Sequence, residues 1–161
     1  MEAYGDAFRQ AKDKVKVADY SVSKVFPMTK DPQVLRSCLT NLHEAQVRAL
    51  DALLLFERTY KRVPAYPVGH LETKLRLFGD YCAKRYNLQE DMIDHIRSVK
   101  ELATLAAAQA PSLSGDGRRL IFREDGFQVK AVPFSDVKIM ISRASAFVES
   151  IGKVVQHDGS H

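Results

Sequence analysis

The chain has 161 residues, 45% of them hydrophobic and 27% charged, with a formal net charge of +4 and a pI near 9.1. This length is enough for one domain, residues 1–161, with a substantial core. No apolar run approaches the ~20 residues that cross a bilayer, and the N-terminus lacks an apolar stretch of signal-peptide type, so we predict a cytoplasmic protein without a membrane partner. The excess of lysine and arginine is small and spread along the chain, which weakens the case for a dedicated phosphate-binding surface.

One long stretch organises the rest of the chain, a helix predicted over residues 32–63. Asp31 is a good N-cap, Pro32 suits the first helical position, and Pro64 disfavours helical conformation at the residue before it. Between these signals apolar residues follow an alternating four-three spacing, without glycine or proline. The apolar face is wide, so we expect neighbours on more than one side. Gln46 interrupts that face, and it is either a buried, hydrogen-bonded side chain that fixes register or a point where the face meets solvent.

Shorter helices are predicted on both sides of this one. The apolar spacing indicates a first helix over residues 2–24, which Pro27 is expected to break. Two more helices are predicted after the central one, over residues 71–86 and 88–110. The last helix begins at Ser135, and the polar tail, residues 156–161, is expected to fray.

The apolar period changes from helical to alternating before the last helix. Two alternating runs flank Asp125-Gly126, and Asp-Gly between such runs is a strong hairpin signal, so we predict a β-hairpin at about residues 119–132. A lone two-stranded hairpin is marginal in water and must pack on the bundle or on another copy. The predicted fold class is therefore mostly α, an up-and-down bundle of four to five helices with one β-hairpin before the last helix.

Arg36 and His43 are the first candidate for chemistry, because a spacing of seven places them on one face of the central helix. The pair resembles the Arg-x4-6-His motif of HEPN ribonucleases, which are also bundles of four or five helices. Ser37 supplies the polar residue that this family usually places after the arginine. The resemblance implies a metal-independent ribonuclease, with the arginine holding phosphate and the histidine acting on a proton, usually across a dimer interface. The alternative is a surface arginine and a histidine at the rim of the core.

Cations and tyrosines gather around the turn that follows the central helix. The predicted RNA-contacting residues are Arg58, Tyr60, Lys61, Arg62, Tyr66, Lys74 and Arg76. Such mixtures can hold backbone phosphates and stack on bases. The alternative is that the cations complement the dipole at a helix C-terminus, and the recurrence of this pattern at residues 84–86 favours that explanation.

Metal and cofactor chemistry is only weakly suggested. Asp91, Asp94 and His95 lie within about one helical turn, but no ligand from another helix can be identified, so we predict no metal site. Phosphate-binding and dinucleotide-binding glycine motifs are absent from the sequence, and we predict no cofactor. Cys38 and Cys82 fall on apolar faces, which favours core thiols over a disulfide or a metal pair.

Two segments, residues 27–67 and 118–137, resemble a group of small, uncharacterised archaeal helical-bundle proteins. The most specific parts are the Lys-Asp-Pro start of the central helix and the Phe-Glu-Arg-x-x-Lys-Arg-Val-Pro run at its end. This resemblance implies the layout of the fold, but it does not imply a function, because the group has no assigned activity. We therefore expect a non-enzymatic interaction protein that self-associates through exposed hairpin edges and an alanine-rich helix end, with RNA as a further candidate partner. A HEPN-like ribonuclease is the alternative.

Overall fold

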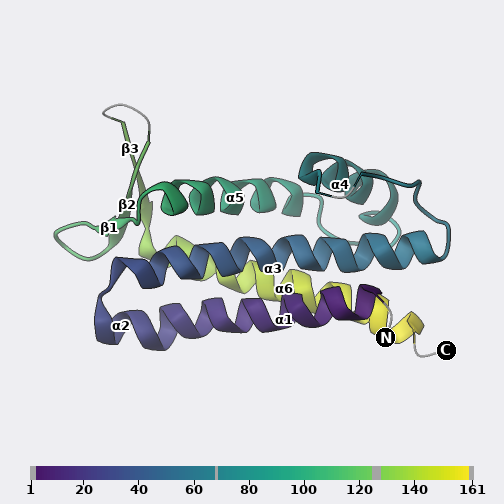
Figure 1. The fold of residues 1–161 in the computed structure, drawn as a ribbon, viewed down its shortest axis with the longest axis horizontal. Coiled ribbons are helices and arrows are strands. Elements are labelled where there is room, and N and C mark those ends of the chain that lie inside the picture. Colours follow the sequence, from purple (N-terminus) through teal and green to yellow (C-terminus); the bar gives the residue numbers. More distant parts are fainter. Residues whose placement is uncertain (1–2, 68, 125–127, 160–161) are drawn as a thin grey trace.

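The computed structural model describes residues 3–67, 69–124 and 128–159, and in it long helices pack side by side with a small sheet at one end (Figure 1). The elements are α1 (Ala3–Tyr20), a first π-helical turn (Ser21–Val25), α2 (Phe26–Thr29), α3 (Pro32–Thr59), α4 (Leu71–Leu77), a second π-helical turn (Phe78–Cys82), α5 (Met92–Ala108), β1 (Ser112–Leu113), β2 (Arg119–Arg123), β3 (Val129–Pro133) and α6 (Phe134–Gly159). This architecture confirms the predicted fold class.

Helix α3 begins as the sequence predicts and ends earlier. The Asp31 carboxylate accepts a hydrogen bond from the amide of Gln33 at 2.9 Å, which is the expected N-cap. The helix ends at Thr59, before the predicted limit at residue 63, because Lys61 takes a left-handed conformation with φ +58°. The amide of Arg62 then bonds back to the carbonyl of Glu57 at 2.8 Å, which closes the helix in a Schellman motif without a glycine.

Pro27 does not break the first helix, contrary to the prediction. The first π-helical turn comes just before Pro27, and in it the amide of Phe26 donates to the carbonyl of Ser21. A regular α-helical turn would press the ring of Pro27 against the carbonyl of Ser23, and the wider π turn comes directly before this point. Helical structure continues through α2 and stops only at Lys30, where φ is +53°.

The remaining helices differ from their predicted limits mainly at the ends. Helix α4 and the second π-helical turn replace the single helix predicted over residues 71–86, and Asn87 takes the left-handed conformation expected of it, with φ +54°. Helix α5 begins at Met92, several residues after its predicted start at residue 88. Helix α6 begins at Phe134, one residue before its predicted start at Ser135. Helix α6 also runs on to Gly159, past the start of the tail predicted to fray.

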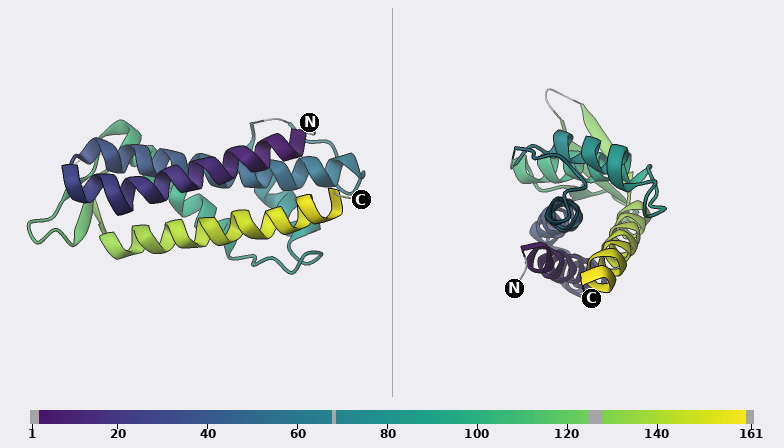
Figure 2. Two further views of the ribbon diagram at one scale, coloured as in Figure 1. Left: turned by 90° about the horizontal axis from the view of Figure 1, so that it is seen from below. Right: turned by 90° about the vertical axis from the view of Figure 1, so that its right-hand side faces the viewer.

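Helix α3 is the spine of the bundle, with α1, α5 and α6 packed around it (Figures 1 and 2). The core consists of two hydrophobic clusters, one in each half of the bundle, and α3 contributes to both. The cluster nearer the sheet takes α3 residues up to Ala45, and the other cluster takes α3 residues from Ala49 onward. Gln46 is therefore at the boundary between them, and it is fully buried.

The sheet has three antiparallel strands in the order β1-β2-β3, so the short strand β1 joins the predicted hairpin. Strands β2 and β3 pair in register from Arg119 opposite Pro133 to Arg123 opposite Val129. One face of the sheet is buried in the cluster near it, through Leu120, Phe122 and Val132. The Asp-Gly turn, residues 125 and 126, lies outside the described residues.

Candidate functional site

Arg36 belongs to the contact between α3 and α5. Its Nε donates a hydrogen bond to the carbonyl of Ala106 at 2.7 Å, and its Nη1 donates to the side chain of Gln33 at 3.1 Å. Ala106 lies in the last turn of α5, where carbonyl groups lack helical partners, so the guanidinium of Arg36 satisfies a helix end. This role competes with the phosphate contact predicted for Arg36.

His43 also turns toward α5, where Lys100 lies close enough to affect its ionisation. Burial and the positive charge of Lys100 lower the pKa of His43 below its usual value. Its Nδ1 atom is buried without a hydrogen-bond partner among the described residues. Arg36 and His43 thus share a face of α3, as the sequence predicts, but that face packs against α5.

Glu57 lies near the end of α3, at the end of the bundle opposite the sheet, and three neighbouring side chains bond to it. Its side chain is fully buried and accepts hydrogen bonds from Arg62 Nε at 2.9 Å, from Arg85 and from the hydroxyl of Tyr86. Burial and the bond to Glu57 raise the pKa of Tyr86 to about 12. The carboxylate therefore holds the end of α3 to the segment after the second π-helical turn.

Lys74 is not on the surface predicted for RNA contact. It is buried in α4, and its Nζ lies 2.7 Å from Oδ1 of Asp51 on α3. Arg48 approaches the other oxygen of Asp51 at 3.3 Å. The pair fastens α4 to α3, because breaking a buried ion pair leaves an uncompensated charge in the core.

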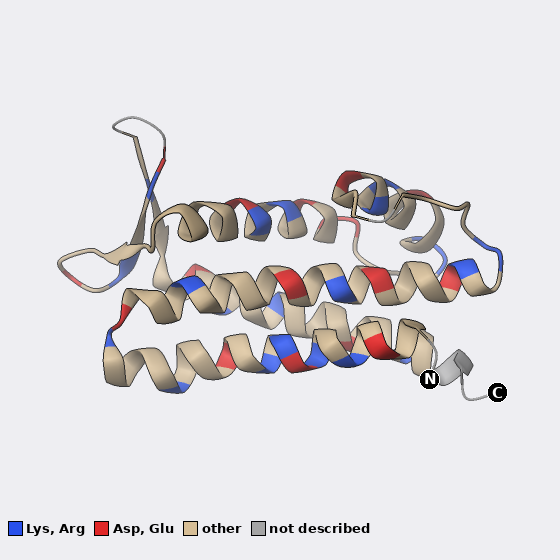
Figure 3. Ribbon diagram, in the orientation of Figure 1, with Lys and Arg blue, Asp and Glu red and all other residues tan. Residues whose placement is uncertain are grey.

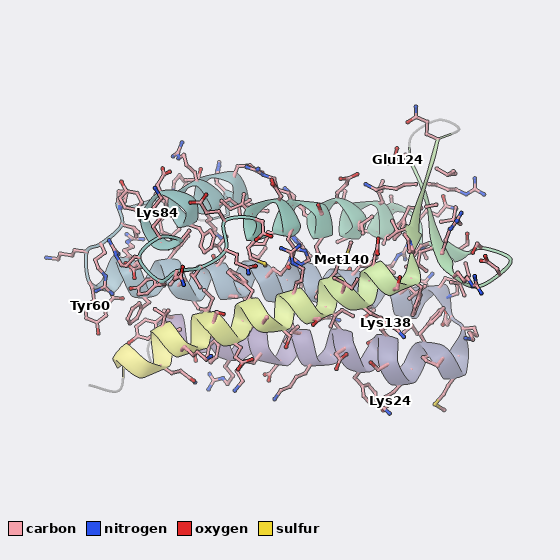
Figure 4. The ribbon with its side chains drawn as sticks, turned by 180° about the vertical axis from the view of Figure 1, so that it is seen from behind. Lys24, Tyr60, Lys84, Glu124, Lys138 and Met140 are labelled. Atoms are coloured by element: carbon pink, nitrogen blue, oxygen red, sulfur yellow. The ribbon has the colours of Figure 1, made fainter. Side chains whose placement is uncertain are left out.

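The structure reduces the predicted cluster to a smaller exposed set. Arg58, Tyr60, Lys61 and Arg76 are exposed, and Tyr66 is partly buried with Arg58 above its ring at 6.0 Å from the centroid. In Figure 4, Tyr60 and Lys84 lie at this end of the bundle, opposite the hairpin that carries Glu124. Along the helices basic and acidic residues alternate instead of forming one continuous basic face (Figure 3).

The acidic run near the start of α5 is divided among different partners. Asp91 pairs with Arg143 at 3.0 Å, and Asp94 lies 3.6 Å from Arg97. His95 is 5% exposed and turns into the core, where it makes a backbone hydrogen bond at Met140 of α6. Within the described part of the chain, no three metal-ligating side chains come together.

Two polar side chains are buried with atoms that lack hydrogen-bond partners in the described part of the chain, which the sequence does not predict. The amide of Gln46 and the Nε2 atom of His95 are buried without hydrogen-bond partners among the described residues. Of the two alternatives predicted for Gln46, the structure confirms the buried side chain. The hydrogen bonds expected for that side chain are not found among the described residues. The burial of His95 could have been predicted, since it shares a helical stripe with Val99 and Leu102.

Cys38 and Cys82 are free, buried thiols, as predicted. The Sγ atom of Cys38 donates to the carbonyl of Ala18 at 3.4 Å. Burial raises the pKa of both thiols to about 12, so neither is a thiolate near neutral pH.

Among the described strands, β3 pairs with β2 on one side and has no partner on the other. The amide of Glu124 donates to Gln128, and that of Phe134 donates to Arg118. In an antiparallel ladder the inward and outward groups alternate, so Val129 and Ala131 direct their backbone groups away from β2.

Exposed apolar side chains lie at the same end of the molecule. Val129 is 57% exposed, Met28 of α2 is 85% exposed, and Ile139 near the start of α6 is 56% exposed. The outer edge of β3, with the exposed side chain of Val129, is a surface that another polypeptide could cover.

No helix in the described ranges combines the length and the apolar character needed to span a bilayer. Comparisons of the chain with protein-family models, with curated proteins and with solved structures find no match.

Proposed function

We propose that this protein is a non-enzymatic interaction protein that self-associates through the outer edge of β3. The observation that carries the proposal is the outward backbone of Val129 and Ala131, which has no strand partner among the described residues, together with the 57% exposed side chain of Val129. Two copies of β3 placed antiparallel would exchange hydrogen bonds in a self-complementary, two-fold arrangement. The edge is short and Pro133 has no amide to donate, so contacts between side chains such as Val129 are needed in addition to the backbone hydrogen bonds.

The alternative, a ribonuclease using Arg36 and His43, has less support from the geometry. The guanidinium of Arg36 is already bonded to the last turn of α5, and His43 is half-buried with one ring nitrogen in the core. Phosphate binding at Arg36 would require these helix contacts to be given up. An RNA cleavage assay that compares the wild type with His43→Ala separates the two functions, because equal activity in both excludes the catalytic role.

Self-association can be tested by measuring molar mass with light scattering across the micromolar range. We expect the wild type to approach about twice the 18.1 kDa of one chain as concentration rises. Val129→Lys is expected to give the mass of one chain, because a charge on a strand edge opposes edge-to-edge pairing. Ala131→Pro removes an outward amide and is expected to do the same.

Val17→Lys is the matched control for this experiment. Val17 is 48% exposed on α1, so the same substitution is made at similar exposure on a helix, away from the strand edge. We expect it to leave the mass unchanged. A wild type that stays monomeric, or three variants with equal effects, contradicts the proposal.

RNA remains a second candidate partner because of the exposed set at the opposite end. Arg58, Lys61 and Arg76 have no carboxylate partner among the described residues, and Tyr60 is 49% exposed beside them. We expect single-stranded RNA to bind with an affinity that falls as salt rises, and Arg58→Ala with Lys61→Ala to weaken it. Arg118→Ala with Lys24→Ala is the control, because it removes one arginine and one lysine at exposed positions near the sheet, at the other end of the bundle. Binding that is insensitive to salt, or equal loss in both double variants, excludes this surface.

A further inference from the structure

A continuous groove runs between α1 and α6. Two adjoining hollows of about 590 Å³ and 460 Å³ share Val15 and Lys16 of α1 with Ser145 and Glu149 of α6. Their lining reaches from Lys138 to Gln156, or about 27 Å along α6 at 1.5 Å per residue. The groove is therefore as long as a helix of about five turns.

The floor of the groove is apolar. It is formed by Phe8 and Val15 of α1 with Ile141 and Val148 of α6. Gly152 contributes to this shape, because a Cβ at that position would lie 2.5 Å from Cζ of Phe8. The ring of Phe8 packs directly over the backbone of α6 there.

The walls carry more positive than negative charge. Lys12 and Lys16 lie on α1, Lys138 and Lys153 lie on α6, and the carboxylates are those of Asp19 and Glu149. None of the four lysines makes an ion pair within the described part of the chain, and the ammonium groups of Lys12 and Lys138 rest over the rings of Phe8 and Phe134.

The contrast with the neighbouring lysine of α1 shows that ion pairing is available nearby. Lys14 lies between Lys12 and Lys16 in sequence, turns toward α3, and pairs with Glu44 at 2.6 Å. Lys12 and Lys16 have no such carboxylate partner within the described part of the chain and remain available to an external anion.

We propose that this groove binds an acidic amphipathic helix of a partner protein. An apolar stripe would pack on the floor between α1 and α6, as a helix does in a hydrophobic groove. Acidic residues on both sides of the stripe would meet the lysines of the two walls, and this complementarity would also speed the encounter. The occupant would add one more helix to the bundle.

Two other occupants fit less well. A second copy of this groove would place lysines against lysines, which opposes a face-to-face dimer. A membrane surface needs apolar groups that protrude, whereas Phe8 and Val148 are 6% and 3% exposed at the bottom of a hollow. The proposal is independent of self-association at β3, because the two surfaces share no residue.

The test uses a fluorescein-labelled synthetic peptide of about 20 residues, with leucines at helical spacing and glutamates elsewhere. Fluorescence anisotropy measures its binding to the wild type, to Lys12→Glu/Lys16→Glu/Lys153→Glu, and to Lys24→Glu/Lys84→Glu/Lys100→Glu. The second triple variant makes the same change in net charge at exposed lysines outside the groove. We expect the groove variant to bind at least about tenfold more weakly and the control to stay within about twofold of the wild type.

A second measurement locates the peptide. An environment-sensitive dye on Ser145→Cys reports from the exposed wall of the groove, and the buried Cys38 and Cys82 do not compete for the label. We expect the dye emission to shift to shorter wavelength when the acidic peptide binds. A peptide with lysine in place of glutamate, and one with the same composition but no apolar stripe, should produce no shift.

Several outcomes overturn the proposal. They are no saturable binding of the acidic peptide, equal loss in the two triple variants, or equal binding of the lysine peptide. Vesicles of phosphatidylcholine and phosphatidylglycerol in equal parts are tested beside the peptide. Vesicle binding that depends on the groove lysines, without peptide binding, would assign the site to a membrane surface instead.

Discussion

His95 is the clearest case in which a single residue should control stability. Burial and the nearby cation of Arg143 lower its pKa, with smaller opposing contributions from the backbone at Met140 and from Asp91. A histidine with a lowered pKa binds its proton less readily in the folded state than in the unfolded state. Its contribution to stability is therefore present above the unfolded pKa of about 6.5 and is lost as pH falls below that value.

We predict that the free energy of unfolding decreases between pH 7 and pH 5, by at most about 1.4 kcal/mol per pH unit for each histidine involved. His43, whose pKa is also lowered, acts in the same direction. His95→Gln should flatten this dependence, and urea unfolding at several pH values measures it. His70→Gln, at an exposed position before α4, is the control. An equal slope in the wild type and in His95→Gln contradicts the assignment.

At the level of single residues, the sequence predicted which side chains are buried better than it predicted their hydrogen bonds and ion pairs. The spacing of Cys38 and Cys82 predicted buried thiols, because an apolar stripe determines which side of a helix faces the core. It could not show that Lys74 reaches Asp51 or that Arg62 folds back onto Glu57. Those contacts depend on how α4 and the following turns are placed against α3, and a long cation has many conformations that its own helix does not restrict.

At the level of elements, Gly152 tests how closely α1 and α6 approach. An added methyl group would overlap the ring of Phe8, so Gly152→Ala should destabilise the protein through overpacking by about 1–3 kcal/mol. Removal of glycine from a helix interior offsets this by about 0.5–1 kcal/mol. Urea unfolding should therefore show a net loss of stability for this variant.

The control for this substitution is Gly115→Ala, since no atom lies within 4 Å of the added Cβ there and the backbone is not left-handed. It should change stability little. Gly152→Ala combined with Phe8→Leu should recover part of the loss, because the smaller side chain leaves room for the methyl group. A neutral or stabilising effect of Gly152→Ala alone would show that the two helices are farther apart.

The limits of the elements could be predicted only where a local signal set them. Asp31 and Pro32 determined the start of α3, because capping and proline act within one turn. The end of α3 was predicted too late, since the Schellman motif formed with a lysine at the left-handed position. The prediction for Pro27 was also wrong, because a π-helical turn has no sequence signal that distinguishes it from a regular turn.

At the level of the whole molecule, α3 connects two hydrophobic clusters that have separate partners. Near the sheet it packs with the first π-helical turn and shares a hydrophobic cluster with β2. Near the other end it packs with α4 and shares a cluster with the second π-helical turn. The sequence predicted a central helix with neighbours on several sides, because its apolar face is wide. The two-part core was not predicted, since it depends on which segments return to each half of α3.

This arrangement predicts where the backbone should be most protected from hydrogen exchange. Amides of residues 45–56 in α3 should exchange slowest, because they are surrounded by α1, α5 and α6 and open only when the bundle unfolds. Residues 60–67 and 109–118 lie in connections with few helical or strand bonds and should exchange much faster. Hydrogen–deuterium exchange followed by mass spectrometry of peptides measures both. If residues 45–56 exchanged as fast as the connections, α3 could not be a continuous helix that holds the two clusters together. The surfaces proposed at β3 and in the groove would then be contradicted as well, because both depend on this arrangement of the bundle.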